Sequence, residues 1–307
     1  MTTMESDGLE AALNPFDILF LGNMATGEIV PFEGHSFEVL GSPLLFASIA
    51  ASRVGGRIAA VTRIPEHREQ LLEPMRSAGV SLFVAPGEIV EYRVLFPTPD
   101  VDKRQPFLLK AGDDFTIDDI PDIPPCLVHI CCMGPSEFQL DLMQALKDRG
   151  FLLSVDMQNF VLQADKETGA VLLQDVPEKE EIFGMARFVK LDAMEAQVLT
   201  GIDDLQGQAD VLQRWGDAEI VITSSAGASV RSKGKTTFAR FTNGSTLGRM
   251  GRGDTVMGSY LARRIDHSAE DSIRFAAALT SIKMEAIGPF SGSVEDVVLR
   301  MGQPTPL

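Results

Sequence analysis

The feature that most constrains the fold is a repeated succession of short apolar runs and helical stretches. The first run, residues 17–21, ends at Gly22-Asn23, and a helix over 44–54 follows with Pro43 near its first position. The glycine pair after this helix stops it, and a second apolar run covers 57–62. Strands that alternate with helices predict an α/β fold, with a mostly parallel sheet and helices on both faces.

The same succession resumes after residue 125. The runs predicted to be strands are 127–132, 151–156, 188–191 and 219–223, and 229–241 is predicted to be a hairpin. The predicted helices are 67–78, 135–149, 193–199, 205–215, 254–265, 269–286 and 294–300. Ligands of such sheets bind beyond the carboxyl ends of the strands, so the polar residues that follow the runs are candidate site residues.

Two β-rich segments interrupt this succession. Residues 28–40 carry turn signals and predict an exposed hairpin, and 81–110 contains short β-like runs broken by prolines and glycines. Antiparallel strands fit these segments better than another strand–helix unit. We expect them to form a small sheet that covers the site as a lid. The expected organisation is a flexible tail over 1–15 and one domain over 16–301.

Composition excludes several classes of protein. A formal net charge of −16 argues against a broad basic surface for nucleic acid. The sequence has no apolar stretch long enough for a membrane span, and its start lacks the pattern of a signal peptide, so we expect a cytoplasmic protein. Cys126, Cys131 and Cys132 form no paired framework, which favours buried, inert thiols over disulfides or a zinc site.

The residues Gly251-Arg252-Gly253-Asp254 stand at the start of a predicted helix. A helix N-terminus offers unpaired N–H groups, and glycines let the backbone approach an anion closely. An aspartate in the first turn is placed to accept a proton from an attacking hydroxyl. The run therefore predicts a phosphoryl-transfer site, although in isolation it also fits a turn that begins a helix.

These residues resemble the Gly-Ala-Gly-Asp signature of the ribokinase-like (PfkB) carbohydrate kinases, and the resemblance extends from about Phe16 to Met301. Further similar pieces occur in the family's order. They are Gly22-Asn23, Gly41-Ser42, the strand end from Asp156 to Asn159, a segment resembling an Asn-x-x-Glu motif in which Asp192 replaces the asparagine before Glu195, and Thr223 with Gly227.

The resemblance implies a three-layer α/β/α fold and a kinase that transfers the γ-phosphate of ATP to a hydroxyl of a sugar, polyol or nucleoside. Asp254 would be the catalytic base, and the amides of Gly251, Arg252 and Gly253 would form the anion hole. Mg²⁺ would be organised through water by Glu195, with Asp192 near it. The nucleotide would lie beside Asp192, Thr223 and Gly227, and the acceptor beside Asn23, Gly41, Ser42 and Asp156.

Several of these residues also have an ordinary structural interpretation. Asp192 is a good helix N-cap, Gly41-Ser42 fits a helix start, and Glu195 fits a solvated helix face. Two positions depart from the family: Gly27 stands where an aspartate usually binds substrate hydroxyls, and Phe46 stands near a usual asparagine. The acceptor side is thus altered, and either an unusual acceptor or lost activity would follow.

Two function classes therefore remain open. One is the kinase, and the other is a catalytically altered relative that only binds a nucleotide or a sugar. A dinucleotide-dependent dehydrogenase fits poorly, because no Gly-x-Gly-x-x-Gly follows the first strand. The exposed edges of the lid sheet predict a homodimer formed through that sheet.

Overall fold

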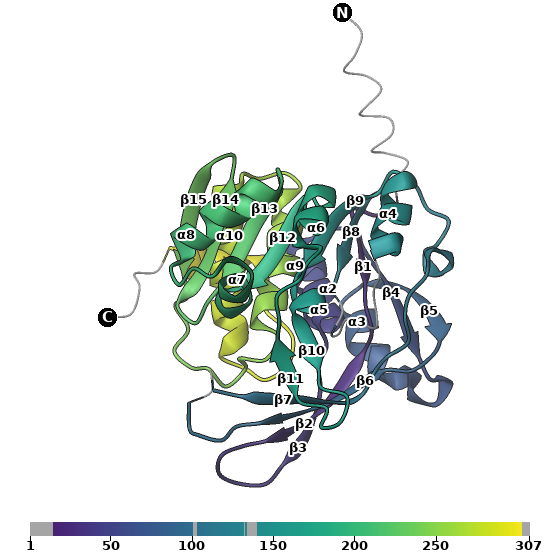
Figure 1. Cartoon of the computed structure of the whole chain (residues 1–307). Coiled ribbons are helices and arrows are strands. Elements are labelled where there is room, and N and C mark those ends of the chain that lie inside the picture. The colour runs from purple at the N-terminus through teal and green to yellow at the C-terminus, as the bar shows by residue number, and fades with distance from the viewer. Residues whose placement is uncertain (1–14, 101–102, 132, 134–139, 303–307) are drawn as a thin grey trace, which may run out of the picture.

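The centre of the fold is a nine-stranded, mostly parallel sheet (Figure 1). The computed structural model describes residues 15–100, 103–131, 133 and 140–302. In spatial order the strands are β15 (Lys235–Arg240), β14 (Gly227–Ser232), β13 (Glu219–Thr223), β12 (Phe188–Asp192), β9 (Leu152–Asp156), β8 (Leu127–Ile130), β1 (Ile18–Leu21), β4 (Ile58–Ile64) and β5 (Ser81–Pro86). Only the pairs β13–β14 and β14–β15 are antiparallel among these described strands, so the expected parallel sheet is confirmed.

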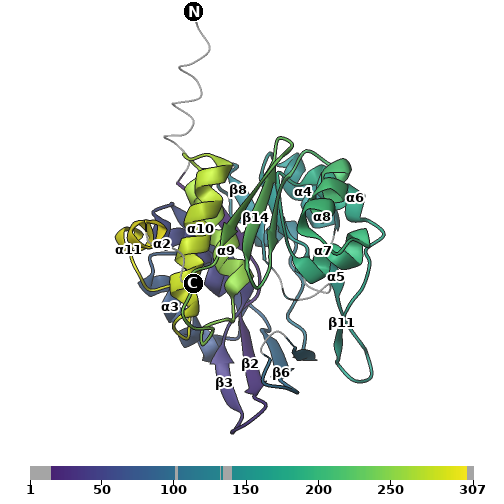
Figure 2. The same cartoon turned by 90° about the vertical axis from the view of Figure 1, so that its left-hand side faces the viewer.

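Helices cover both faces of this sheet, as the edge-on view of Figure 2 shows. One layer contains α2 (Pro43–Val54), α3 (Glu73–Ser77), α9 (Arg252–Arg264) and α10 (Ala269–Met284), with α11 (Val294–Met301) beside α10. The other contains α4 (Leu140–Asp148), α6 (Lys179–Met185), α7 (Ala193–Thr200) and α8 (Leu205–Leu212). The three-layer α/β/α architecture is therefore confirmed.

Alternation along β1 explains why the sheet needs helices on both sides. Ile18 and Phe20 pack into one apolar cluster, and Leu19 and Leu21 pack into the other, with all four side chains buried. A strand buried on both faces has no polar face, so its sequence is a continuous apolar run. The same reasoning covers the other short apolar runs from which the strands were predicted.

A second sheet of four strands lies below the central sheet in Figure 1. Its order is β3 (Phe37–Leu40), β2 (Ala25–Val30), β6 (Val90–Leu95) and β7 (Gln105–Lys110). The expected small sheet is present, but it is mixed rather than antiparallel, because β2 and β6 run parallel. The expectation that it includes residues 81–86 is not met, since β5 pairs with β4 at the edge of the central sheet.

The sequence patterns do not predict the hairpin that links the two sheets. The short α5 (Gln158–Val161) follows β9, and β10 (Leu162–Ala164) and β11 (Val171–Leu173) then extend toward the small sheet (Figure 1). At the hairpin tip the Leu108 amide of β7 donates to the Gly169 carbonyl at 2.8 Å. The strand that carries Asp156 is therefore connected directly to the small sheet.

Some predicted helices differ in detail. Residues 67–78 form the 3₁₀ segment η1 (Glu66–Leu72) and then α3, because Pro74 lacks the amide that one continuous helix would use. The end of 205–215 is the 3₁₀ segment η4 (Gln213–Trp215), and η2 (Ile117–Asp119) was not predicted. Of the helix predicted over 135–149, residues 135–139 lie outside the described residues, as do Cys132 and residues 1–14 of the tail.

Two expectations drawn from composition can be compared with the structure. Cys126 and Cys131 are buried free thiols, and burial raises the pKa of Cys126 to about 11, which disfavours the reactive thiolate. Within the part of the chain that the structure describes, no helix combines the length and the apolar character needed to cross a bilayer.

Candidate active site

The N-terminus of α9 is the centre of the candidate site. Gly251 caps this helix with a φ of 74°, and a Cβ at this residue would lie 2.2 Å from the Phe46 ring. Both the left-handed conformation and the aromatic contact therefore require glycine. The Gly251 carbonyl accepts from the Thr255 amide at 2.9 Å, which begins the helix within the predicted motif.

The amides expected to form the anion hole do not all have the same role. The Arg252 amide donates to the Arg249 carbonyl at 3.1 Å, so it closes the preceding turn. Among the hydrogen bonds of the described residues, none uses the amides of Gly251, Gly253 or Asp254. The donors available to an anion at this helix end are thus those of Gly251, Gly253 and Asp254, and Arg252 contributes its side chain at most.

The need for glycine at position 253 comes from a neighbouring side chain rather than from the backbone conformation. A Cβ here would lie 3.0 Å from Lys190 Cε and 3.1 Å from Lys190 Nζ. Glycine therefore lets the ammonium of Lys190 approach the first turn of α9. On the same side, Thr223 Oγ1 would lie 3.5 Å from that Cβ. Strands β12 and β13 thus deliver a cation and a hydroxyl to the helix N-terminus.

Lys190 is itself held by Asp156. Its Nζ lies 3.0 Å from Asp156 Oδ2, and both side chains are buried. Asp156 Oδ1 also accepts from the Gln158 amide at 3.0 Å, which fixes the carboxylate in place. Asp156 thus orients Lys190, and its predicted contact with the acceptor stays a prediction.

Asp254 lies in the first turn of α9 and is partly buried. Burial raises the pKa of its carboxyl to about 6, while Lys190, Lys283 and Arg104 act in the opposite direction. A carboxyl with this pKa is largely ionised at neutral pH and still basic enough to accept a proton from an alcohol. The predicted base therefore has an environment suited to that role.

Asp192 and Glu195 form the N-terminal capping box of α7. Asp192 Oδ1 accepts from the amides of Met194 and Glu195, each at 2.8 Å, and Glu195 Oε2 accepts from the Asp192 amide at 2.7 Å. Burial raises the pKa of Glu195 to about 8. The N-cap interpretation of Asp192 is thus satisfied, and Glu195 lies buried rather than on a solvated face.

No group of three or more acidic, histidine or cysteine side chains able to hold a metal ion occurs among the described residues. Mg²⁺ commonly needs only one or two carboxylates, with water and substrate phosphates as its other ligands. One oxygen of each of Asp192 and Glu195 is left outside the capping box, which fits an ion held through water.

The residues predicted to contact the acceptor are mostly occupied by local structure. Ser42 caps α2, since its Oγ accepts from the Leu45 amide at 3.1 Å. The Asn23 side-chain amide donates to the Asp113 carbonyl at 3.1 Å, while its buried Oδ1 has no partner in the described structure. On the donor side, Gly227 begins β14 in a tight turn and accepts from the Ser224 amide at 2.8 Å.

Two aromatic side chains, those of Tyr92 and Phe46, lie at the positions that depart from the family, and we call them the aromatic wall. Tyr92 of β6 lies across Gly27, where a Cβ would be 2.3 Å from the ring. Its hydroxyl donates to the Gly41 carbonyl at 3.3 Å and lies 3.5 Å from Met250 Sδ. Gly41 is in turn close to Met250 and Phe46. The small sheet thereby reaches the loop that precedes α9.

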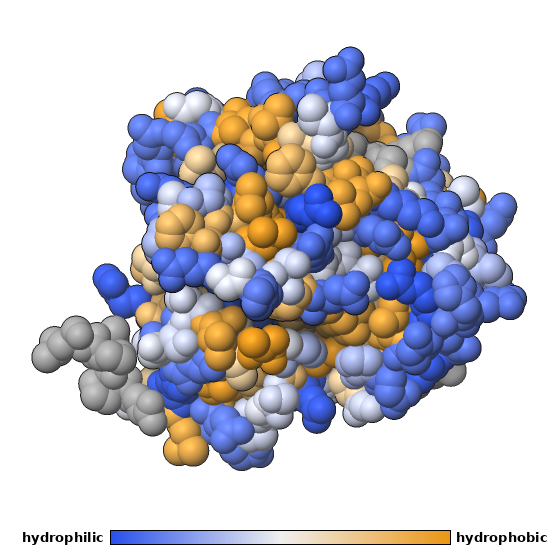
Figure 3. All heavy atoms as spheres, turned by 90° about the horizontal axis from the view of Figure 1, so that it is seen from below, coloured by the Kyte–Doolittle hydropathy of each residue, from blue (hydrophilic) through white to orange (hydrophobic). Residues whose placement is uncertain are grey.

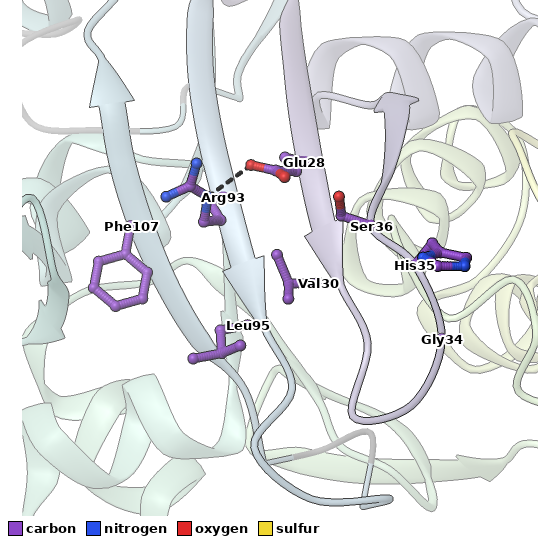
Figure 4. Close-up of a pocket in the computed structure, with 8 residues that line it drawn as sticks. All are labelled: Glu28, Val30, Gly34, His35, Ser36, Arg93, Leu95 and Phe107. Carbon is purple, nitrogen blue, oxygen red and sulfur yellow. Dashed lines mark hydrogen bonds and ion pairs between the residues drawn. The ribbon is translucent and has the colours of Figure 1, made fainter.

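A hollow of about 520 Å³ lies elsewhere, on the small sheet (Figure 4). Glu28 and Arg93 form an ion pair within it at 2.7 Å, and His35 lines its edge. Side chains alternate along strands, so Glu28 and Arg93 lie on the sheet face opposite to Gly27 and Tyr92. The hollow is therefore separate from the cluster around Asp254, and His35 belongs to it.

The sequence reasoning missed three residues of this region: Lys190, Lys283 and Tyr92. Lys190 carried a signal, because it is the one charged residue within the otherwise apolar run 188–191. A buried cation in such a strand needs a partner, and Asp156 at the end of the adjacent strand supplies it. Lys283 and Tyr92 lie among ordinary helix and strand residues, and only the fold brings them to the loop before α9.

Comparisons with known proteins identify the fold. No protein-family model matches the sequence, and neither does any curated protein. A sulfate complex of a pyrophosphate-dependent kinase in the ribokinase family is similar to this chain with a TM-score of 0.84 and 28% identity, over 92% of this chain and 99% of the other. A ribokinase from Arabidopsis thaliana, solved with ribose and ATP, gives 0.71 and 14%, over 94% and 99%.

An adenosine kinase from Sinorhizobium meliloti gives a TM-score of 0.73 and 13% identity, over 94% of this chain and 100% of that one. The structural neighbours are thus ribokinase-family kinases, and the resemblance stated from the sequence motifs is confirmed. These neighbours act with different phosphate donors and acceptors, so they support a kinase of this kind without fixing either.

Proposed function

We propose that this chain is a phosphotransferase that moves a phosphoryl group from inorganic pyrophosphate to a hydroxyl of a cyclic polyol. The observation that carries the proposal is the N-terminus of α9, where Asp254 lies beside the unused amides of Gly251 and Gly253 and close to the Lys190 ammonium. Phosphoryl transfer is catalysed mainly by positioning and by fixed charges, and this arrangement provides both.

In the proposed step the Asp254 carboxylate accepts the proton of the acceptor hydroxyl. The hydroxyl oxygen forms a bond to the terminal phosphorus of the donor, and the bond from that phosphorus to the bridging oxygen breaks. The leaving group departs as inorganic phosphate. The amides of Gly251 and Gly253, with Lys190, stabilise the charge on the transferring group, and the proton on Asp254 returns to solvent.

The choice of pyrophosphate as donor rests on two considerations. The neighbours with 27–28% identity are described as pyrophosphate-dependent, whereas the neighbour solved with ATP has 14%. Pyrophosphate has no base or ribose, so its recognition depends on amides and cations. Lys190 supplies a cationic side chain at this helix end, next to the unused amides. ATP, expected from the sequence motifs, remains the alternative donor.

The choice of a cyclic polyol rests on the aromatic wall and on one neighbour. Tyr92 places its ring across Gly27 and its hydroxyl beside Gly41, and a flat ring suits the C–H face of a ring substrate. The unpartnered Oδ1 of buried Asn23 is an acceptor for a substrate hydroxyl. A neighbour with 27% identity was solved with a pyrophosphate analogue and myo-inositol.

Mg²⁺ would supply charge neutralisation for the donor phosphates when bound. Asp192 and Glu195 would hold it through water, since each has one carboxylate oxygen that the capping box leaves over. The role of the chain's own residues is then to place the donor: Asp192 and Glu195 would hold the ion that binds its phosphates, and the amides at the start of α9 would hold the transferring phosphate.

The test is a donor and acceptor panel followed by ³¹P NMR. The purified chain is incubated with Mg²⁺ and either pyrophosphate or ATP, with inositols, pentoses, hexoses and nucleosides as acceptors. We expect a phosphomonoester signal with pyrophosphate and an inositol, and at least about tenfold slower transfer from ATP. Faster transfer from ATP would replace the donor, and transfer only to a nucleoside or a pentose would replace the acceptor.

The panel also distinguishes the binding-only alternative. A chain that binds pyrophosphate or a polyol by calorimetry, but gives no phosphomonoester with any pair, would be a binding protein with an altered acceptor side. Turnover with any pair would exclude that alternative.

A further inference from the structure

Lys283 is a buried cation that the proposed chemistry does not use. It lies near the end of α10 and is 3% exposed. Its ammonium donates to the main-chain carbonyls of Gly248 and Met250, and its Nζ stands 4.6 Å from the centre of the Phe46 ring. No ion pair of the described residues includes it, so carbonyl dipoles and an aromatic face solvate this charge.

Keeping a cation there has a cost. Burial lowers the pKa of Lys283 to about 8, and the Asp254 carboxylate acts in the opposite direction. An apolar side chain of similar volume would fill the space without this cost. We therefore expect the charge to have a function at this place, and the two carbonyls that the ammonium binds indicate what that function is.

The Met250 carbonyl belongs to the peptide unit that carries the Gly251 amide. In a trans peptide the C=O and N–H bonds point in opposite directions. When Lys283 draws the Met250 oxygen toward α10, the Gly251 N–H must point away from α10. That N–H is one of the amides left unused at the start of α9.

Gly248, which lies earlier in the same loop, is also held against the end of α10. Its amide donates to the Met284 carbonyl at 2.8 Å, and a Cβ at this glycine would lie 1.8 Å from the Ala286 carbonyl oxygen. The backbone is therefore pressed against the end of α10 before it turns through Gly251. Only Arg249 and Met250 lie between this anchor and Gly251, the left-handed N-cap of α9. Lys283 sets the orientation of the last peptide unit of this stretch, Met250–Gly251.

We propose that Lys283 is a positioning residue whose ammonium acts as a built-in monovalent cation, holding the Met250–Gly251 peptide so that the Gly251 amide faces the anion. This proposal rests on the proposed function. It implies that the loop carries its own cation and that exchanging the alkali ions in solution leaves the parent chain unaffected.

The test is cation rescue of Lys283→Ala. Phosphomonoester formation is measured in ammonium, methylammonium, potassium and choline chloride at constant ionic strength. In choline chloride we expect Lys283→Ala to lose at least about thirtyfold in kcat, with a much smaller change in the KM for the acceptor. In each of the small cations, the kcat of Lys283→Ala should be at least tenfold higher than in choline. The kcat of the parent should differ by less than twofold among the four salts.

Two control variants show whether these outcomes depend on the charge of Lys283. Lys147→Ala removes an exposed lysine from the last turn of α4 and should leave every value unchanged. Lys283→Met fills the space without a charge, so it should be as inactive as Lys283→Ala and insensitive to the salts. Full activity of Lys283→Met, or an equal kcat of Lys283→Ala in all four salts, would overturn the proposal.

A second readout separates this proposal from the proposed function. Thermal unfolding midpoints are measured in the same salts without any substrate. We expect ammonium and potassium to raise the midpoint of Lys283→Ala above its value in choline, with no such difference for the parent. That difference in a chain without kinase activity would leave the positioning role standing while the proposed function fails. Its absence, together with absent rescue in an active kinase, would overturn the positioning role alone.

Discussion

At the scale of single residues, the site is an arrangement of buried charges that balance one another. Lys190 lies within the field of four carboxylates, those of Asp156, Asp192, Glu195 and Asp254. Their field raises its pKa although burial acts against it, so the ammonium stays charged at the helix N-terminus. Burial raises the pKa of Asp254, one of the four, to about 6, which is within the range useful for a base.

The Lys190–Asp156 pair can be tested by replacing both partners together. Lys190→Met/Asp156→Asn removes the cation without leaving a buried carboxylate unpaired, so the chain should still fold. We expect kcat to fall about 100-fold, the usual cost of losing one charge-stabilising group. The matched control is Lys235→Met/Glu270→Gln, which removes an exposed pair and should leave kcat unchanged.

Asp156→Asn alone keeps the ammonium but removes its ion-pair partner and its orientation, so a smaller loss of kcat is expected. A double variant that turns over within threefold of the parent would show that Lys190 serves the core rather than the reaction.

The raised pKa of Asp254 predicts opposite pH effects on activity and stability. A base must be ionised to accept a proton, so kcat/KM should fall below pH 6. Because the folded-state pKa lies above the usual value, folding favours the protonated form, and this stabilisation is lost as the pH rises through about 6.

Asp254→Asn should therefore be more stable than the parent at pH 8, by about 1–2 kcal/mol, and equal to it near pH 4. Chemical denaturation at the two pH values measures this difference. A variant that is less stable than the parent at pH 8 would contradict the burial that raises this pKa.

At the scale of elements, the beginning of α9 could be predicted from its sequence, whereas its surroundings could not. Gly251 and Asp254 act through local rules, a left-handed cap and a first-turn carboxylate, which four consecutive residues reveal. The contact between Gly253 and Lys190 joins residues on different elements, and no local pattern specifies it. Likewise β5 has the composition of the small sheet's strands, and only its pairing with β4 places it in the central sheet.

The β10–β11 hairpin was not predicted for the same reason, because its strands are short and it is held by β7. Gly169 has a φ of 71°, and a Cβ there would lie 2.5 Å from the Leu108 carbonyl oxygen. Gly169→Ala should therefore detach the hairpin tip from the small sheet. We expect faster hydrogen exchange at the Leu108 amide, with Gly234→Ala in the β14–β15 turn as the control glycine of positive φ.

Unchanged exchange at Leu108 in Gly169→Ala would mean that the hairpin stays bound to the small sheet without this close approach.

At the scale of the whole molecule, the end that carries the small sheet exposes apolar side chains. Figure 3 shows apolar patches between hydrophilic ones on this end, and Phe32 and Phe37 are 51% and 48% exposed. Unpaired strand edges and exposed aromatic residues favour association. We predict a homodimer through the small sheet, which Phe37→Glu should convert to a monomer in light scattering, while Val298→Glu on α11 should not. A monomeric parent at micromolar concentration would contradict this.

The central claim is that Asp254 accepts the proton of the acceptor hydroxyl at a helix N-terminus that binds the donor phosphate. The most direct measurement compares kcat and pyrophosphate affinity for the parent, Asp254→Asn and Asp141→Asn, the last a first-turn aspartate of α4 exposed to solvent. We expect Asp254→Asn to lose about 10²–10⁴ in kcat while binding pyrophosphate as well as the parent, and Asp141→Asn to match the parent. An Asp254→Asn variant with the parent's kcat would contradict the account.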